Sequence, residues 1–210
     1  MIITISRMFG SGGSDVAAKV SRALGWTLLD NAVVDEVADR LGISRSEVSS
    51  LEERVPSLAE RIASSLAMSA PELAVPVADA PMMDTAETRV VGVTRRVMDE
   101  AIQQGNAVLV GRGAQSMLAD RPDALHVFCY APKAFLVQYA IANRGVNAAT
   151  AAQEVDKMNK QREQYVKRHW GRDWRSFDNY HLCIDTGRLG IDMAAQLVVR
   201  VARERFSLPA

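Results

Sequence analysis

The 210-residue sequence has no apolar run approaching the length of about 18 residues that a membrane span requires. The apolar run at its N-terminus is short and is not preceded by basic residues, unlike a secretory signal, so we expect a cytoplasmic protein. Its 25 basic and 25 acidic residues give a formal net charge of zero. Bulk charge therefore gives no support for binding to nucleic acid or to a membrane.

Cysteine and histidine are also scarce. Cys129 and Cys183 each fall inside an apolar, strand-like run, and we expect two buried, reduced thiols rather than a structural disulfide. The three histidines, His126, His169 and His181, are too scattered to form a zinc site. Disulfide-stabilised and zinc-dependent folds are therefore disfavoured.

A glycine-rich segment near the N-terminus is the clearest positive signal. The residues RMFGSGGS (7–14) follow an apolar, β-branched run and precede a segment with helical character. Glycines allow successive N–H groups to point inward, and the dipole of a following helix adds partial positive charge, so a strand, loop and helix in this order bind anions. The predicted phosphate-binding residues are Gly10, Ser11, Gly12, Gly13 and Ser14.

This loop differs from the standard GxxxxGK[ST] phosphate loop at two positions. Arg7 replaces the first glycine and Gly13 replaces the lysine, whereas Ser14 keeps the hydroxyl position that holds Mg²⁺ and is the predicted metal ligand. A guanidinium beside a core is costly unless it faces an anion or a carboxylate. Arg7 therefore either supplies the charge of the missing lysine or pairs with Asp15 or Asp30. For the loop as a whole, the alternative is a tight turn between strand and helix that binds no ligand.

Short apolar runs alternate with amphipathic segments, which predicts βαβ units and a parallel sheet. The predicted strands are Ile2–Ser6, Thr27–Leu29, Ala107–Val110, Ala124–Tyr130 and His181–Ile184. The predicted helices are Ser14–Leu24, Asn31–Leu41, Thr88–Gln104, Pro132–Asn143, Asn147–Trp170 and Gly190–Phe206, and Ser44 with Glu47 forms a capping box that starts another.

Two segments stand out within what we interpret as one domain, residues 1–210. An insert at about residues 55–86 contains four prolines and many Ala, Ser and Met residues, which suits a movable flap, a surface against a second subunit in a homodimer, or a poorly ordered loop. Residues 144–175 carry eight Lys or Arg against four Asp or Glu, and we interpret them as a basic helical lid. We expect the lysines that line up along one face of this helix to be exposed to solvent rather than to form a binding surface.

Several motifs together resemble the cytidylate kinase-like proteins, relatives of cytidylate kinase among the P-loop nucleoside monophosphate kinases. The residues that carry the resemblance are Ile3–Ser14, Leu24–Asp30, Val110–Ala114, Arg162–Tyr165, Gly171–Trp174 and Tyr180–Gly190. In that family the loop lysine is usually missing and the preceding arginine is retained. The resemblance implies a P-loop NTPase-like, three-layer α/β/α fold with a five-stranded parallel sheet and a helical lid.

The resemblance also implies ATP and Mg²⁺ as ligands and transfer of the γ-phosphoryl group to a nucleoside monophosphate, a pyrimidine one such as CMP or dCMP. The glycine loop would hold the ATP phosphates, and Arg112 would bind the phosphate of the acceptor. Ligands in such sheets lie beyond the carboxyl ends of the strands, where Arg7, Asp30, Arg112 and Asp185 are expected. Asp30 and Arg112 are the predicted substrate-binding residues. Alternatively, Arg112 forms an ion pair or caps a helix, and Asp30 is the N-cap of the helix that follows it.

Arg162 matches the lid arginine of the family's D-x-x-R-x-x-Y stretch, in which Asn159 replaces the aspartate here. Arginines that close over a transferring phosphoryl group stabilise its negative charge, so Arg7, Arg112 and Arg162 are the predicted catalytic residues. Two other functions remain open. One is a non-catalytic nucleotide-binding protein with a regulatory or assembly role that lost efficient transfer with the lysine; the other is an oligomeric scaffold that uses the insert.

Overall fold

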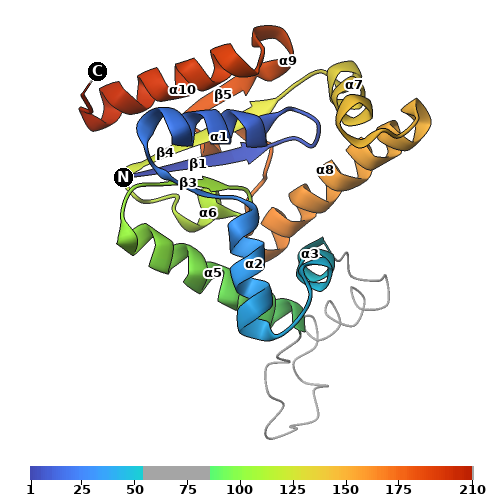
Figure 1. The fold of residues 1–210 in the computed structure, drawn as a ribbon, viewed down its shortest axis with the longest axis horizontal. Coiled ribbons are helices and arrows are strands. Elements are labelled where there is room, and N and C mark those ends of the chain that lie inside the picture. The colour runs from blue at the N-terminus through green and yellow to red at the C-terminus, as the bar shows by residue number, and fades with distance from the viewer. Residues whose placement is uncertain (54–85, 210) are drawn as a thin grey trace, which may run out of the picture.

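A five-stranded parallel sheet forms the centre of the structure, a computed structural model that describes residues 1–53 and 86–209 (Figure 1). The strands are β1 (Ile2–Arg7), β2 (Thr27–Leu29), β3 (Ala107–Val110), β4 (Ala124–Tyr130) and β5 (Leu182–Asp185). Their order in the sheet is β2-β3-β1-β4-β5, and every neighbouring pair is parallel. The predicted parallel sheet is confirmed, with β1 at its middle.

The helices lie close to their predicted positions. They are α1 (Gly13–Leu24), α2 (Asn31–Leu41), α3 (Arg45–Glu53), α5 (Ala86–Gln104), α6 (Ala114–Met117), α7 (Lys133–Arg144), α8 (Ala148–Trp170), α9 (Thr186–Leu189) and α10 (Ile191–Phe206), with a 3₁₀ turn at Phe177–Asn179. Apart from Ala86, which begins α5, the insert at 55–86 lies outside the described residues. No helix in the described ranges is long and apolar enough to cross a membrane.

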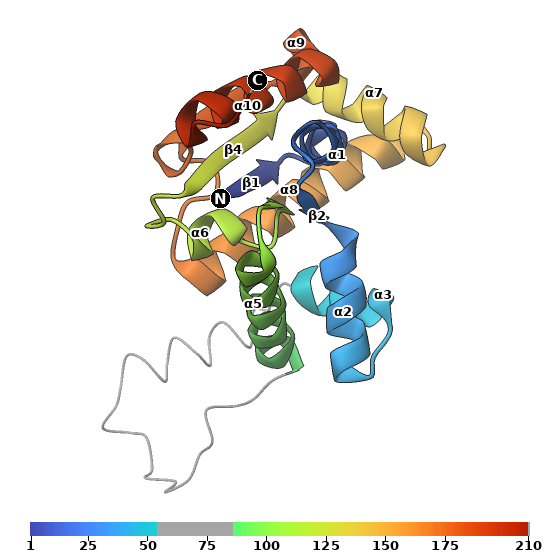
Figure 2. The same ribbon diagram turned by 60° about the vertical axis from the view of Figure 1, so that its left-hand side comes forward.

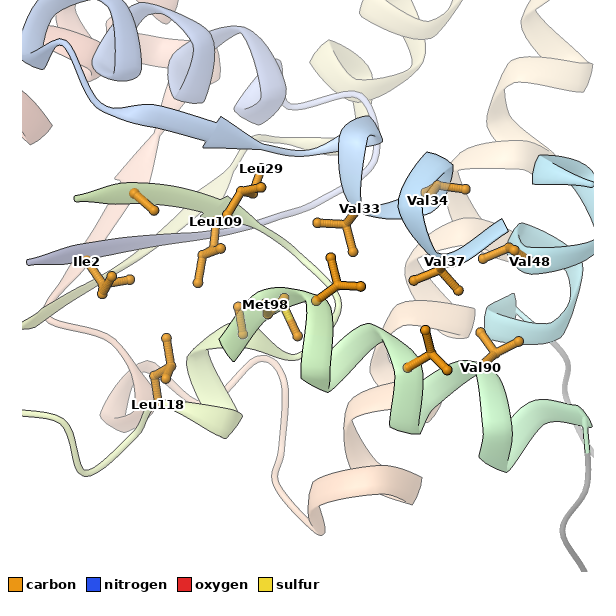
Figure 3. Packing of buried hydrophobic residues seen from close by; sticks show 14 of the residues in the cluster. Ile2, Leu29, Val33, Val34, Val37, Val48, Val90, Met98, Leu109 and Leu118 are labelled. Carbon is orange, nitrogen blue, oxygen red and sulfur yellow. The ribbon is translucent and has the colours of Figure 1, made fainter. Parts of the chain in front are cut away.

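Helices cover both faces of the sheet, which gives the three layers that were expected. Helices α1 and α10 lie together on one face, and α2, α3, α5 and α6 lie on the other (Figures 1 and 2). Successive residues of β1 alternate between the two cores: Ile3 and Ile5 point toward α1 and α10, whereas Ile2 points toward the opposite layer. Figure 3 shows this second core, where Ile2 and Leu109 from the sheet and valines of α2 and α5 pack together.

The helix ends follow the expected signals. Gly25 and Gly42 adopt left-handed conformations at the ends of α1 and α2, as glycine readily does. The capping box is confirmed: the Glu47 carboxylate accepts from the Ser44 amide at 2.8 Å, and the Ser44 hydroxyl accepts from the Glu47 amide at 3.2 Å. Asn147 caps α8 by accepting from the Thr150 amide at 2.9 Å.

The two cysteines differ in exposure. Cys129 in β4 is fully buried, and its burial raises the pKa of the thiol to about 12. Cys183 in β5 is exposed, so the expectation that both thiols are buried is wrong for this residue. The reason is its place in the sheet, because β5 is an edge strand and only β4 pairs with it. Both cysteines are free thiols, as expected.

Candidate functional site

The glycine loop between β1 and α1 is packed so closely that two of its positions require glycine. Gly10 and Gly12 have left-handed φ angles of 83° and 69°. A Cβ added at Gly10 would overlap the backbone carbonyl of Leu136 in α7, and one added at Gly12 would overlap the side chain of Ile191 in α10. The loop is therefore enclosed by α7 and α10 and keeps one defined shape.

Hydrogen bonds fix the first half of the loop. The Met8 carbonyl accepts from the amide of Ser11 at 3.2 Å and from its hydroxyl at 2.8 Å. The Ser11 carbonyl accepts from the hydroxyl of Thr186, which is 2.7 Å away and completely buried. The same hydroxyl lies 3.0 Å from the carbonyl of Tyr130 at the end of β4. Thr186 thus ties the loop to the neighbouring strand.

The second half of the loop offers open donors. Gly13, Ser14 and Asp15 are the first residues of α1, where backbone N–H groups have no carbonyl one turn earlier in the helix. The Val16 amide is the first to bond back, to the Gly12 carbonyl at 3.0 Å. Within the described residues, no protein acceptor is recorded for the amides of Gly12, Gly13 and Ser14. These amides, at the positive end of the helix dipole, are suited to bind an anion.

Arg7 excludes a side chain from the position of the missing lysine. Arg7 is the last residue of β1, and a Cβ added at Gly13 would overlap the Cβ of Arg7 and lie 3.0 Å from its Cγ and 3.3 Å from the Cβ of Cys129. Real Cβ atoms do not approach other atoms so closely. A lysine at position 13 and Arg7 in its present conformation are therefore sterically incompatible.

The guanidinium of Arg7 extends toward the ends of β2 and β3. It lies over Gly111, where it leaves no space for a Cβ, and its Nη2 is 3.5 Å from Oδ1 of Asp30. Each of these two side chains is 16% exposed. Of the two carboxylates considered as partners, Asp30 makes the pair, whereas Asp15 accepts a hydrogen bond from the Tyr139 hydroxyl. Burial and this carboxylate together raise the pKa of Tyr139 to about 12.

Arg112 lies next to this pair. It is one of two non-glycine residues in the described chain with positive φ, at 48°, and it stands between two left-handed glycines, Gly111 and Gly113. Such a backbone costs free energy and is concentrated at functional sites. Its Nη1 donates to the Asp30 carbonyl at 3.2 Å, so Asp30 contacts both arginines. Asp30 occupies the N-cap position of α2, but its carboxylate makes no capping hydrogen bond.

Helix α8 contacts the loop from the other side. The Arg162 Nη1 donates to the backbone carbonyl of Arg7 at 2.7 Å, and the Asn159 side-chain oxygen accepts from the Phe9 amide at 2.7 Å. The Arg162 guanidinium also lies 5.8 Å from the centre of the Phe9 ring. Helix α8 is thus hydrogen-bonded to the start of the glycine loop.

A cavity of about 120 Å³ lies between α8 and the ends of β1 and β3. It is lined by Ser6, Arg7, Gly111, Arg112, Gly113, Met158, Gln161, Arg162, Tyr165, Val166 and Trp174. Three of these side chains are guanidinium groups, and the described lining includes no carboxylate. Because arginine binds phosphate and carboxylate oxygens through paired hydrogen bonds, the cavity is suited to an anionic group.

Two tryptophans hold the C-terminal end of α8 against the sheet. A Cβ added at Gly113 would overlap the ring of Trp170, and the guanidinium carbon of Arg95 from α5 lies 5.0 Å from the centre of that ring. Trp174 is buried and packs edge-on against Phe128 of β4, with ring centres 5.3 Å apart. The position of α8 beside the cavity is therefore defined by packing as well as by hydrogen bonds.

The structure gathers most, but not all, of the residues singled out from the sequence. Arg7, Arg112 and Arg162 line the cavity, and Asp30 contacts Arg7 and Arg112. Asp185 does end a strand, but its carboxylate caps α9 by accepting from the amides of Gly187 and Arg188. The contacts of Asn159 and Thr186 with the loop were missed; the spacing of Asn159 and Arg162, one turn apart on one helix face, was the available signal.

Three solved structures are similar to this chain over nearly its whole length. An uncharacterized protein from Eubacterium ventriosum gives a TM-score of 0.69 at 21% identity and covers 96% of this chain and 98% of its own. TT1252 from Thermus thermophilus gives 0.54 at 20%, with 97% of each chain covered. Shikimate kinase from Bacteroides thetaiotaomicron gives 0.53 at 12%, with 96% and 97% covered. These likenesses show a P-loop kinase fold.

Comparison with curated protein sequences found no match. The sequence does match the cytidylate kinase-like family, over residues 2–188. This range contains the glycine loop, the Gly111-Arg112-Gly113 turn and all of α8. The chain therefore belongs to the cytidylate kinase-like family.

Proposed function

We propose that the protein transfers the γ-phosphoryl group of ATP to the phosphate of a nucleoside monophosphate. The observation that carries this proposal is the adjacency of two anion sites, an open row of loop amides and an arginine-lined cavity, with Arg7 contacting both. Phosphoryl transfer needs two phosphate groups held in line, and its catalysis depends mainly on positioning and on charge stabilisation. The family favours a pyrimidine acceptor such as CMP or dCMP.

The loop would bind the phosphates of ATP. The amides of Gly12, Gly13 and Ser14 would donate to them, and the shape imposed by Thr186 prepares the loop for this task. Ser14, whose side chain is exposed at the start of α1, would hold Mg²⁺ together with water molecules that this ion retains. When bound, Mg²⁺ would neutralise phosphate charge.

The cavity would bind the phosphate of the acceptor. Arg112 lies in its wall in a strained backbone conformation, and its side chain donates to the Asp30 carbonyl. A phosphate monoester carries close to two negative charges near neutral pH, which the guanidinium groups of Arg7, Arg112 and Arg162 would balance. Asp30 would orient Arg7 and Arg112 rather than contact the acceptor.

The transfer itself would require no general base. An oxygen of the acceptor phosphate is already anionic, so it would form a bond to the γ-phosphorus while the bond between that phosphorus and the bridging oxygen breaks. ADP would leave with the bridging electron pair. Arg7 and Arg162 would stabilise the charge that spreads over the transferring group, and α8 would exclude water.

Incubation of the purified protein with ATP, Mg²⁺ and single monophosphates (CMP, dCMP, UMP, AMP and GMP) tests the proposal. Nucleoside diphosphate formed from at least one of them is the expected result. Tight ATP binding without turnover on any acceptor would instead favour the non-catalytic nucleotide-binding role, for which the absence of a lysine at position 13 is the argument.

Arg112→Ala separates the acceptor site from the ATP site. We expect the KM for the acceptor to rise about 10- to 100-fold, because a charge-assisted hydrogen bond to a buried phosphate is lost. The KM for ATP should change little. Arg200→Ala is the matched control, since Arg200 is an exposed arginine of α10 that pairs only with Glu204 in the described chain.

A further inference from the structure

Asn159 is a buried polar residue whose single recorded hydrogen bond in the described chain reaches the glycine loop. Its side chain is 3% exposed, although it belongs to the basic helix α8. Its side-chain oxygen accepts from the Phe9 amide at 2.7 Å. Buried side-chain amides are costly unless they are hydrogen-bonded, so this contact accounts for the presence of a polar residue at this place.

Asn159 acts together with Arg162. The two residues are one turn apart on α8 and bond to the two ends of the same short segment, Asn159 to the Phe9 amide and Arg162 to the Arg7 carbonyl. Between them, the Met8 amide donates to the Cys129 carbonyl of β4 at 2.9 Å. The start of the loop is therefore fixed from the lid helix and from the sheet at the same time.

We propose, resting on the proposed function, that Asn159 is a positioning residue: it holds the start of the glycine loop in the shape that binds the ATP phosphates. The lid helix is therefore a structural part of the nucleotide site.

Amide hydrogen exchange, measured by NMR, tests whether Asn159 holds the loop. In Asn159→Leu the Phe9 amide should exchange about tenfold faster than in the wild type, because its acceptor is removed. The Met8 amide, bonded to β4, should keep its wild-type rate. Gln153→Leu, at an exposed position of the same helix, is the control and should change neither amide. If Asn159→Leu does not fold, Asn159→Ser, whose side chain is too short to reach Phe9, replaces it. Unchanged exchange at Phe9 would overturn the proposal.

Steady-state kinetics tests whether this contact serves the nucleotide site. Asn159→Leu should raise the KM for ATP about tenfold, because the loop is no longer held. Asn159→Asp, which offers the same acceptor to Phe9, should leave the Phe9 amide protected and the KM for ATP near its wild-type value. A wild-type KM for ATP in Asn159→Leu would overturn the proposal.

The failure of this proposal is distinguishable from failure of the proposed function. Wild-type protein that binds ATP but transfers no phosphate overturns the phosphotransferase. The dissociation constant for ATP in Asn159→Leu, with the exchange at Phe9, then decides the role of Asn159. Wild-type protein that binds no ATP overturns both proposals.

Discussion

The Cβ of Arg7 occupies the space into which any side chain at Gly13 would project. Arg7 ends β1 and Gly13 begins α1, so the two residues face each other across the glycine loop. The chain can therefore carry an arginine at position 7 or a lysine at position 13, but not both in this packing. The absence of the lysine is a consequence of how the loop is packed rather than an isolated loss.

Gly13→Lys should accordingly weaken the protein instead of repairing a standard phosphate loop. We expect the free energy of unfolding in urea to fall by about 1–3 kcal/mol, the usual cost of overpacking. ATP binding should weaken as well, because the displaced Arg7 disturbs the loop. Arg7→Gly, which removes the obstructing Cβ, combined with Gly13→Lys should be more stable than the two single changes predict, by more than about 0.5 kcal/mol. The double variant should also bind ATP more tightly than either single variant.

Strictly additive effects of the two changes on stability and on ATP affinity would contradict this prediction. Gly92→Lys provides a matched control, because a Cβ at Gly92 has no atom within 4 Å. Combined with Gly92→Lys, Arg7→Gly should show no coupling.

Gly113→Ala should cost more stability than Gly145→Ala. Both glycines have nearly the same left-handed φ, 69° and 65°, so the backbone strain of an alanine is the same. A Cβ at Gly145 has open space, whereas one at Gly113 would overlap Trp170. Thermal and urea unfolding should show an excess of about 1–3 kcal/mol for Gly113→Ala. Equal losses would mean that α8 moves away from the turn at no cost.

Thr186→Val should impair the loop without touching a ligand. The buried Thr186 hydroxyl donates to the Ser11 carbonyl, and valine leaves that carbonyl without its donor. We expect a loss of about 1–3 kcal/mol in unfolding free energy and a raised dissociation constant for ATP. Thr27→Val, at an exposed position of β2, serves as the control and should change neither quantity. Calorimetric titration with ATP measures the affinity.

Stability should fall as the pH drops from 6.5 toward 4. His126 is buried, its Nδ1 lies 2.8 Å from the Thr4 hydroxyl, and its ring stacks on that of His181. Burial is the main reason that the pKa of His126 is lowered to about 4, and the charge of His181 lowers it further. The unfolded chain takes up a proton near its ordinary value of about 6.5, so between these two pH values it binds more protons than the folded state. The folded state therefore keeps its full free energy of unfolding above pH 6.5 and loses part of it as the pH falls from 6.5 toward 4. His126→Gln should flatten the urea-unfolding profile between pH 6.5 and 5, and parallel profiles would contradict the assignment.

The sequence was sufficient for most of the fold because each main element has a local signature. Glycines mark the ends of α1 and α2, and uninterrupted apolar runs mark β3 and β4. The single-turn helices α6 and α9 were not predicted, since four residues are too few for a helical period. The exposure of Cys183 was predicted wrongly because it depends on the order of the strands, which no local pattern encodes.

The candidate site was predictable in part for a related reason. Strand ends in a parallel sheet meet at one edge, so the meeting of Arg7, Asp30 and Arg112 follows from sequence position. The bonds of Asn159 to Phe9 and of Thr186 to Ser11 join residues 150 and 175 positions apart. Such contacts arise only from the packing of α8 and of the segment after β5. The catalytic roles of the arginines stay predictions until activity is measured.

The bond between Thr186 and Ser11 also bears on when this loop acquires its final form during synthesis. Its glycines leave the ribosome well before the hydroxyl that completes their shape, which arrives 175 residues later. A nascent or truncated chain that stops before the fifth strand therefore lacks the finished loop. The loop reaches its final shape only after Thr186 has been synthesised.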